Sequence, residues 1–395
     1  MKKIFSILLL LPICAFYSCQ QENENIEEDP IIATKTILMY LPYTGYINDL
    51  YPYFLDNINA IKKGIEDQQG LKGNAFFIFI AQDKKNAALI RVRYKGTKCV
   101  QDTLRKFVGF QYNQADHIAR VLNYVKAEAP ANNYAMLIGC HGMGWLKAST
   151  YDTNNVQEIR KLQIQKKSNI LTRWFGGNTY MTDITTLAEA ITSVNMKMQY
   201  ILFDDCYLSN IETAYDLKDV TNYLIASTSE IMAIGMPYQK MWKFLSQDQP
   251  DYQALCNEFY NFYSTYQYPY GTLGITDCKA VKDIAIIMKN INAKFKPSKE
   301  ELPEMQSLDG FTPSIFFDFG QYVNILCKDD NLKRVFNVQL KKLMPYATHT
   351  GKYYSAYTGK AYTINHFSGI TISDPSLNSA ATQGFSLSQW YIDTH

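Results

Sequence analysis

The stretch YAMLIGCHGMGW, residues 134–145, decides the fold and indicates where the chemistry lies. An apolar run ends there in Cys140, His141 and Gly142, although the whole chain has only five histidines. A short continuous apolar run that is bounded by glycine is typical of a buried strand. A histidine directly after such a strand lies at its carboxyl end, which is where open α/β sheets bind their ligands.

A second stretch, YILFDDCYLSNIETA at residues 200–214, is built in the same way. Its apolar run ends in Asp204, Asp205 and Cys206, and a helical pattern follows. If the two strands are neighbours in one parallel sheet, the imidazole of His141 and the thiol of Cys206 come close together at the same edge.

Apolar runs and helical patterns alternate along the rest of the chain. Strands are expected at residues 34–43, 74–82, 87–94, 134–140, 199–205, 221–228 and 271–278. Helices are expected at residues 48–65, 113–130, 183–194, 208–218, 252–266 and 279–295, with Asp183 as the N-cap of the third. This alternation predicts an α/β fold, a mostly parallel sheet with helices on both faces. Shorter strands near the C-terminus predict a smaller α/β region packed against it.

Composition and charge limit the classes of function. The chain has 395 residues, is 47% hydrophobic and 19% charged, and carries a formal net charge of +2. This composition is that of an ordinary globular protein, and the small net charge argues against nucleic acid or an anionic surface as the main partner. We expect four segments: a signal at 1–19, a tether at 20–33, a main α/β domain at 34–295 and a C-terminal subdomain at 296–395.

The N-terminus resembles a targeting segment. Two lysines precede an apolar core at residues 4–12, which is too short for a stable membrane span and is typical of a secretory signal. Ser18 and Cys19 resemble the lipobox of bacterial lipoproteins, in which the cysteine carries the lipid, although Phe16 stands where leucine is usual. Plain secretion with cleavage nearby is the alternative. The polar, acidic stretch at 20–33 is expected to be flexible, so we predict lipid anchoring in the bacterial cell envelope, on the periplasmic side or at the surface.

A thiol beside an imidazole is the main functional hypothesis. Cysteine becomes a useful nucleophile when a nearby histidine takes its proton or stabilises the thiolate. Gly142 lacks a Cβ, so a substrate carbonyl can approach its backbone N–H, and the amide of Cys206 is a natural second oxyanion donor. The alternative is structural, because buried cysteines are usually inert. Cys140 precedes His141 on the strand, so its side chain is expected on the opposite face.

Both stretches resemble those of the clostripain family of cysteine peptidases, within the caspase-like clan. HGMGW at 141–145 is similar to the family's His-Gly-x-Gly-Trp, and residues 204–214 are similar to its Asp-Ala-Cys-x-Met block with a following glutamate, here Glu212. Three further segments resemble the family in the expected order: residues 227–238, 317–326 and 368–375. The resemblance implies a caspase-like fold and an endopeptidase with His141 as general base and acid and Cys206 as nucleophile.

The resemblance also implies cleavage after Arg or Lys. Asp204, two residues before the nucleophile, matches the family's pocket aspartate, and Ser227 matches in the block that follows. A pocket for a cationic side chain needs such a carboxylate, because the buried charge is otherwise unpaired. Capping of the following helix is the alternative role of Asp204. Ile234 stands where the family has a second pocket acid, which predicts an altered S1 pocket that Glu230 or Asp205 compensates, or one that accepts a less charged residue.

Processing and cofactors depend on the same resemblance. Some family members cut themselves between the histidine and cysteine blocks, and the insert at 147–179 offers several basic residues for such a cut. An ordinary solvated loop is the alternative. Some members depend on calcium, but no acidic loop here has recognisable ligand spacing, and the scattered cysteines show no zinc motif. We expect no cofactor and no metal site.

Two other classes of function remain besides the peptidase. A catalytically silent lipoprotein on the same fold would bind a peptide or a protein, which the altered pocket and the tether leave open. A purely structural envelope protein would need neither the histidine nor the cysteine. The prediction is a cell-envelope cysteine endopeptidase that acts on a peptide or protein substrate and meets the membrane only through its N-terminal lipid.

Overall fold

Residues 32–45, 50–148, 181–374 and 376–395 are described by the computed structural model of the chain. The signal with Cys19, most of the tether and nearly all of the insert at 147–179 lie outside these residues. The predictions made for those segments stay predictions.

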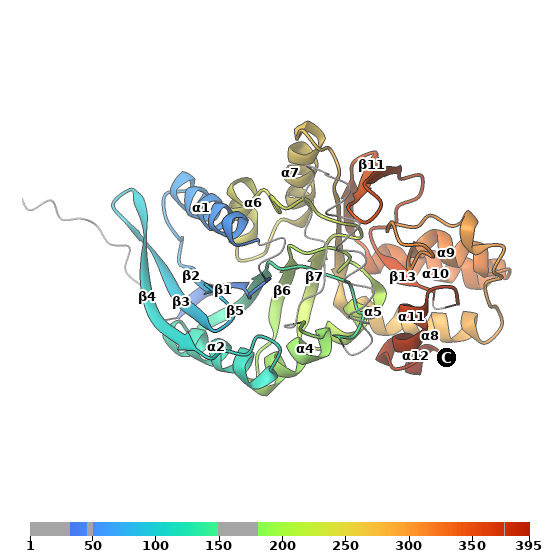
Figure 1. Ribbon diagram of the computed structural model, residues 1–395, viewed down its shortest axis with the longest axis horizontal. Helices are drawn as coiled ribbons and strands as arrows, with labels where there is room; N and C mark the ends of the chain where they lie inside the picture. Colours follow the sequence, from blue (N-terminus) through green and yellow to red (C-terminus); the bar gives the residue numbers. More distant parts are fainter. Residues whose placement is uncertain (1–31, 46–49, 149–180, 375) are drawn as a thin grey trace, which may run out of the picture.

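A mixed sheet of nine strands forms the centre of the molecule, in the order β10-β8-β7-β6-β5-β1-β2-β3-β4 (Figure 1). Its strands are β1 Ala33–Leu41, β2 Ala75–Ala81, β3 Asn86–Lys95, β4 Lys98–Val108, β5 Ala131–Ile138, β6 Met198–Phe203, β7 Thr221–Ala226, β8 Thr272–Asp277 and β10 Tyr346–His349. The five central strands, from β7 to β2, pair in parallel. Antiparallel pairs occur only at the two edges of this sheet, so the predicted α/β fold with a parallel centre is confirmed.

Helices cover both faces of the sheet, with α1 and α6 on one face and α2 and α4 on the other (Figure 1). Their bounds are α1 Tyr51–Asp67, α2 Ala115–Glu128, α4 Ile184–Ser193, α5 Ile211–Leu217, α6 Tyr238–Leu245, α7 Tyr252–Thr265, α8 Val281–Asn292, α9 Phe319–Leu326, α10 Asp330–Leu343, α11 Ser379–Phe385 and α12 Gln389–Thr394. Each face follows from helical spacing: in α1, Phe54, Ile58, Ile61 and Ile65 lie on one stripe and are all buried. Asp183 is the N-cap residue of α4, as predicted, but its carboxylate accepts from the amide of Ala148 at 2.8 Å rather than from an amide of the helix.

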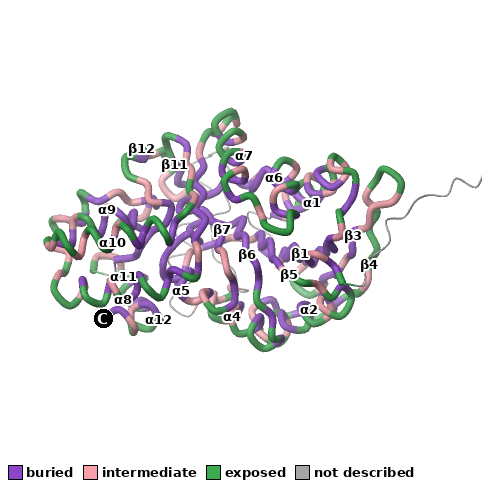
Figure 2. The backbone as a smooth tube through the Cα atoms, turned by 180° about the vertical axis from the view of Figure 1, so that it is seen from behind, coloured by how far each residue is buried: buried purple, intermediate pink, exposed green. Residues whose placement is uncertain are grey.

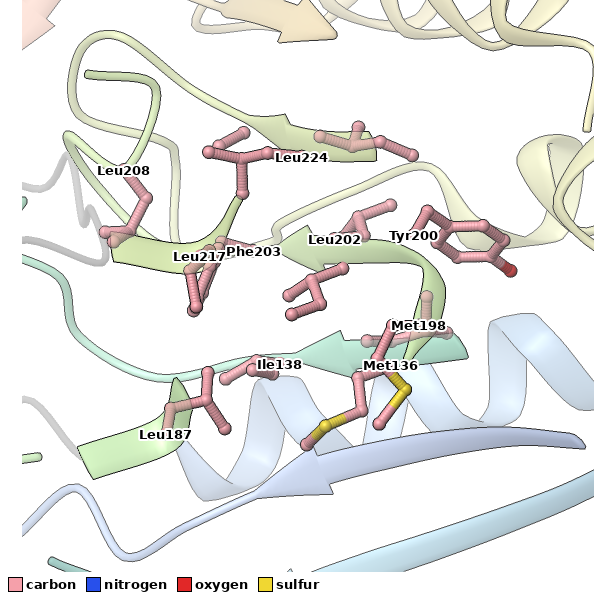
Figure 3. Packing of buried hydrophobic residues seen from close by; sticks show 14 of the residues in the cluster. Met136, Ile138, Leu187, Met198, Tyr200, Leu202, Phe203, Leu208, Leu217 and Leu224 are labelled. Atoms are coloured by element: carbon pink, nitrogen blue, oxygen red, sulfur yellow. The ribbon is translucent and has the colours of Figure 1, made fainter. Parts of the chain in front are cut away.

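The core lies on and around the central strands. Strands β2 and β6 are buried at every position, and the burial colouring concentrates there while the outer helix faces are exposed (Figure 2). Figure 3 shows this packing beside the site, where Ile138 of β5, Leu202 and Phe203 of β6 and Leu187 of α4 gather. Parallel strands that are covered on both faces carry continuous apolar runs, which is why these strands were recognisable in the sequence.

The C-terminal segment completes the sheet and adds two small ones. Strand β10 pairs with β8 at the edge of the main sheet. Strand β9, Phe316–Asp318, pairs with β13, Thr371–Ser373, and β11, Lys352–Ser355, pairs with β12, Lys360–Thr363. The boundary that we placed at residue 296 remains a prediction.

Candidate active site

The ends of β5 and β6 bring the two predicted catalytic residues to the same edge of the sheet. The strands are parallel neighbours, and Ile138 lies opposite Phe203 in the register. His141 is three residues beyond Ile138, and Cys206 is three residues beyond Phe203. The amide of Asp204 donates to the carbonyl of Ile138 at 2.7 Å, so the pairing continues past the last ladder residue. The condition set for the two residues to share an edge, that their strands are neighbours in one parallel sheet, is met.

Gly142 is in direct contact with the cysteine loop. A Cβ at this position would lie 2.3 Å from the carbonyl oxygen of Cys206 and 2.4 Å from Cδ2 of Leu208. Both distances are far below van der Waals contact, so only glycine fits without a shift of the backbone. The sequence suggested that the missing Cβ leaves room for a substrate. In the fold, it also lets the histidine loop pack on the cysteine loop.

Cys206 is fully buried, and a backbone amide points at its sulfur. The N–H of Ile231 donates to Sγ at 3.3 Å. A donor at this distance stabilises negative charge on sulfur. Burial raises the pKa of two other buried cysteines, Cys256 and Cys278, to about 12 and keeps both thiols protonated.

Asp205 of the cysteine loop is hydrogen-bonded to the histidine loop. Its carboxylate accepts a short hydrogen bond from the amide of Cys140, and the thiol of Cys140 lies 3.4 Å from Oδ2. Cys140 and His141 both line one cavity, and the expectation that the Cys140 side chain lies on the opposite face stays a prediction. Because β5 ends at Ile138, strand alternation does not fix the direction of the side chain at position 140.

Asp204 is fully buried directly after β6, and helix α5 does not need it. The side chain of Asn210 is the N-cap and accepts from the amide of Thr213 at 2.7 Å. The alternative role of Asp204 as the cap of this helix is therefore wrong, because the loop runs on to Asn210 before the helix begins.

Ser227 lies at the end of β7 within a cluster of hydroxyl groups. Its Oγ donates to the carbonyl of Ser229 at 2.9 Å and lies 2.8 Å from Oγ1 of Thr272. The neighbouring Glu230 carboxylate is also engaged, because it accepts from the hydroxyl of Tyr207 at 2.9 Å and from the amide of Ala356 at 2.9 and 3.0 Å. Ile234 is only half-buried, and its carbonyl accepts from the side chain of Asn57 at 2.8 Å.

A third segment of chain ties the two motifs together. Ser373 of β13 donates its amide to Glu212 at 2.8 Å, and its hydroxyl accepts from the indole N–H of Trp145 at 2.7 Å. Burial raises the pKa of Glu212 to about 8, so this carboxyl is neutral at moderately acidic pH. The tryptophan of the histidine motif and the glutamate of the cysteine motif therefore share a partner that lies more than 150 residues away, which no local pattern predicts.

The described residues add three observations on metals, membranes and disulfides. Within 32–45, 50–148, 181–374 and 376–395, no group of three or more His, Cys, Asp or Glu side chains could hold a metal ion. None of the helices in these ranges is long and apolar enough to cross a membrane. No disulfide joins two of the cysteines described.

Comparison with known proteins identifies the class of protein. The fold and the paired loops are those of a caspase-like cysteine peptidase. The model of the clostripain family matches residues 43–312, so the chain belongs to the clostripain family and is a cysteine peptidase. Comparison with curated protein sequences gives no match.

Three solved structures illustrate the likeness. A secreted C11 cysteine protease from Bacteroides thetaiotaomicron, called iotapain, is 42% identical with a TM-score of 0.82, covering 93% of this chain and 100% of its own. A clostripain from Bacteroides thetaiotaomicron ATCC 29148, in complex with the peptide inhibitor BTN-VLTK-AOMK, is 50% identical with a TM-score of 0.54, covering 56% of this chain and 99% of its own. An inactive zymogen C11 protease from Parabacteroides distasonis is 23% identical with a TM-score of 0.75, covering 93% of this chain and 99% of its own, and shows likeness of fold alone.

Proposed function

We propose that this peptidase cleaves peptide bonds with a dyad of Cys206 and His141. The sulfur of Cys206 attacks the scissile carbonyl after His141 takes the thiol proton. Backbone N–H groups of Gly142 and Cys206 hold the oxyanion. His141 then protonates the leaving amine, and water, activated by the same imidazole, hydrolyses the thioester.

The main support for this proposal is that the two residues follow a pair of opposed strand residues by the same number of positions. His141 and Cys206 each follow the opposed pair Ile138 and Phe203 by three residues, and Gly142 packs on the carbonyl of Cys206. The amide of Ile231 beside the sulfur supports a thiolate in addition. Burial of Cys206 means that the substrate must reach the sulfur through a rearrangement of the surrounding loops.

The pocket for the residue before the scissile bond is proposed to use Asp204 as its anion. In support, Asp204 is fully buried two residues before the nucleophile and is not the cap of α5. The inhibitor bound to the 50% identical neighbour contains the sequence VLTK, which ends in lysine. Ser227 would line the same pocket through its backbone, since its hydroxyl is bonded internally. With Ile234 in place of a second acid, we expect weaker discrimination for Arg and Lys.

The test is hydrolysis of a fluorogenic peptide panel that varies the residue before the scissile bond, with the wild type and Cys206→Ala. We expect cleavage after Arg or Lys, and loss of turnover by at least about 1,000-fold in the variant with unchanged folding. Cysteine-dependent cleavage after other residues would retain the dyad and refute Asp204 as the pocket anion. Unchanged turnover by Cys206→Ala would refute the dyad.

Lipid anchoring through Cys19 is proposed on the lipobox-like residues alone. The measurement is membrane fractionation of Cys19→Ser, which we expect to release the protein into the soluble fraction. An unmodified wild-type N-terminus in mass spectrometry would exclude the anchor.

A further inference from the structure

A cavity of about 110 Å³ adjoins His141 and extends from the cysteine loop to the end of β1. Its walls come from the ends of β1, β5 and β6, from α2 and α4, and from the histidine and cysteine loops. They include Tyr40, Ile138, His141, Met143, Ile184 and Leu187. Ile138 and Leu187 lie close to each other in Figure 3. Apolar surface dominates, and an apolar cavity of about 150 Å³ in another protein is large enough for benzene. This cavity therefore has room for an aliphatic side chain.

The order of the strands relates the cavity to the reaction. From β7 through β6 and β5 to β1, the strand ends carry Ser227, Cys206, His141 and Tyr40 in that order. The proposed pocket for the residue before the scissile bond lies at β6 and β7. His141 protonates the amine that departs, and this amine belongs to the residue after the scissile bond. The cavity adjoins His141 and reaches the end of β1, which lies farther from β7 than His141 does, so the departing residue faces it.

One wall of the cavity holds a polar atom without a partner. The side chain of Tyr40 is only 4% exposed, and its hydroxyl makes no hydrogen bond to any of the described residues. A buried hydroxyl without a partner is costly and is usually satisfied by water or by a ligand. Burial keeps the pKa of Tyr40 well above its usual range, so the hydroxyl stays a donor. It can donate to an acceptor that enters the cavity.

The charges on the cavity walls further limit which substrate side chains can occupy the cavity. Two carboxylates, those of Asp183 and Asp205, line the cavity with the apolar residues. They repel an acidic side chain. Glycine would leave the apolar walls in contact with water. A neutral side chain of leucine or glutamine size fills the volume, and the amide of glutamine offers an acceptor to Tyr40.

We propose that this cavity is the subsite for the substrate residue that follows the scissile bond, and that it selects neutral side chains of leucine or glutamine size. The proposal rests on the proposed Cys206–His141 mechanism and adds to it the specificity on the leaving side. Tyr40, Ile184 and Leu187 are its specificity-determining residues.

The experiment uses the full chain and internally quenched peptides that differ only at the residue after the scissile bond: Leu, Gln, Gly or Asp. We expect kcat/KM for Leu and Gln to exceed that for Gly by about tenfold or more, because apolar pockets discriminate by about this much per small group. The kcat/KM for Asp should be lower than that for Gly. A ranking that is flat within about twofold overturns the proposal.

Two variants locate the selection in the cavity. Ile184→Phe narrows it and should reduce the Leu-to-Gly ratio to near unity, whereas the matched control Ile286→Phe, at a 63% exposed position on α8, should keep the wild-type ratio. Tyr40→Phe removes no hydrogen bond between described residues and should fold normally. It should lower the Gln-to-Leu ratio about fivefold. An unchanged Leu-to-Gly ratio in folded Ile184→Phe, or an unchanged Gln-to-Leu ratio in Tyr40→Phe, overturns the proposal.

Covalent labelling separates this inference from the mechanism on which it rests. A thiol-directed peptide reagent that has no amino-acid residue on the leaving side should label Cys206 in the wild type and in all three variants. Labelling and cleavage without any leaving-side preference overturn the subsite alone. Absence of both labelling and cleavage overturns the dyad, and the subsite with it.

Discussion

The two ends of the parallel strands use buried polar groups in different ways. At the amino end, Lys35 of β1 donates to the carbonyls of Leu245 at 2.9 Å and of Gln247, and Gln199 of β6 donates to the carbonyl of Asp248 at 2.7 Å. These side chains fasten the loop after α6 over the sheet. They satisfy carbonyl groups that would otherwise be buried without donors.

At the carboxyl end, the buried polar groups include four acids in the segments that follow β6 and β7. Asp204, Asp205, Glu212 and Glu230 are each at most 2% exposed. Burying carboxyl groups is expensive unless they are neutral or hydrogen-bonded. The buried polar side chains at the amino end therefore hold a loop over the sheet. Those at the carboxyl end include carboxyl groups that are costly to bury, at the place where the chemistry is proposed. Substitutions at the first end should change stability alone, and those at the second should change activity as well.

The largest expected effect is that of Gly142→Ala at the carboxyl end. The added Cβ would meet the carbonyl of Cys206 at 2.3 Å, so the two loops must separate. A displacement of about 1 Å between catalytic groups costs about 100-fold in rate, and overpacking costs about 1 to 3 kcal/mol of unfolding free energy. We would measure kcat/KM and urea denaturation against Gly351→Ala, where an added Cβ has no described atom within 4 Å. Equal activities of the two variants would contradict the close packing.

Glu212→Gln should remove a pH dependence of stability. Burial raises the pKa of Glu212 from 4.5 to about 8, so between these values the unfolded chain releases a proton that the folded chain keeps. The wild type therefore loses stability as pH rises through this window, by an amount on the order of a few kcal/mol. Glutamine stays neutral, so the advantage of the variant over the wild type should grow from pH 5 to pH 8. Urea denaturation at both values is the measurement, with exposed Glu300→Gln as control. If the difference in unfolding free energy between variant and wild type is the same at both pH values, the idea that Glu212 is neutral in the folded state is refuted.

Lys35→Met tests the amino end of the sheet. The variant keeps the length of the side chain but leaves the carbonyls of Leu245 and Gln247 without this donor. We expect a loss of about 1 to 3 kcal/mol in the free energy of unfolding, with kcat/KM per folded molecule unchanged. Lys84→Met, at an exposed position, is the matched control. A fall in kcat/KM of folded Lys35→Met would contradict the expectation that substitutions at the amino end change stability alone.

The sequence predicted the features that local patterns encode. The central strands appeared as continuous apolar runs, and the polar residues behind β5 and β6 indicated one shared edge, which the register confirms. Strand β4 was not predicted, because Lys98–Val108 is mostly exposed and shows no alternation; pairing with β3 makes it a strand. Two further contacts were not predicted because their partners lie far apart in the sequence. The contact of Glu230 with Ala356 spans 126 residues, and that of Glu212 with Ser373 spans 161.

Asp205 supplies the smallest and most selective test. The family pattern has alanine at this position, whereas here the carboxylate accepts from the amide of Cys140 and holds the histidine loop. Asp205→Asn keeps one oxygen acceptor for the amide of Cys140, loses the charge and replaces the oxygen that lies 3.4 Å from the Cys140 thiol with an NH2 group, so kcat/KM should fall by less than about threefold. Asp205→Ala leaves the amide of Cys140 without this acceptor, and an unpaired buried donor costs about 1 to 3 kcal/mol.

The two Asp205 variants separate the hydrogen bond from the charge. If the carboxylate acts by positioning the loop, Asn should rescue most of the kcat/KM that Ala loses, and KM should change less than kcat. If Asn and Ala are equally impaired, the charge beside His141 matters and positioning of Cys140 does not. In that case, Asp205 would influence the reaction through the field that it exerts on the imidazole, and the carboxyl end would differ from the amino end in its electrostatics rather than in its packing.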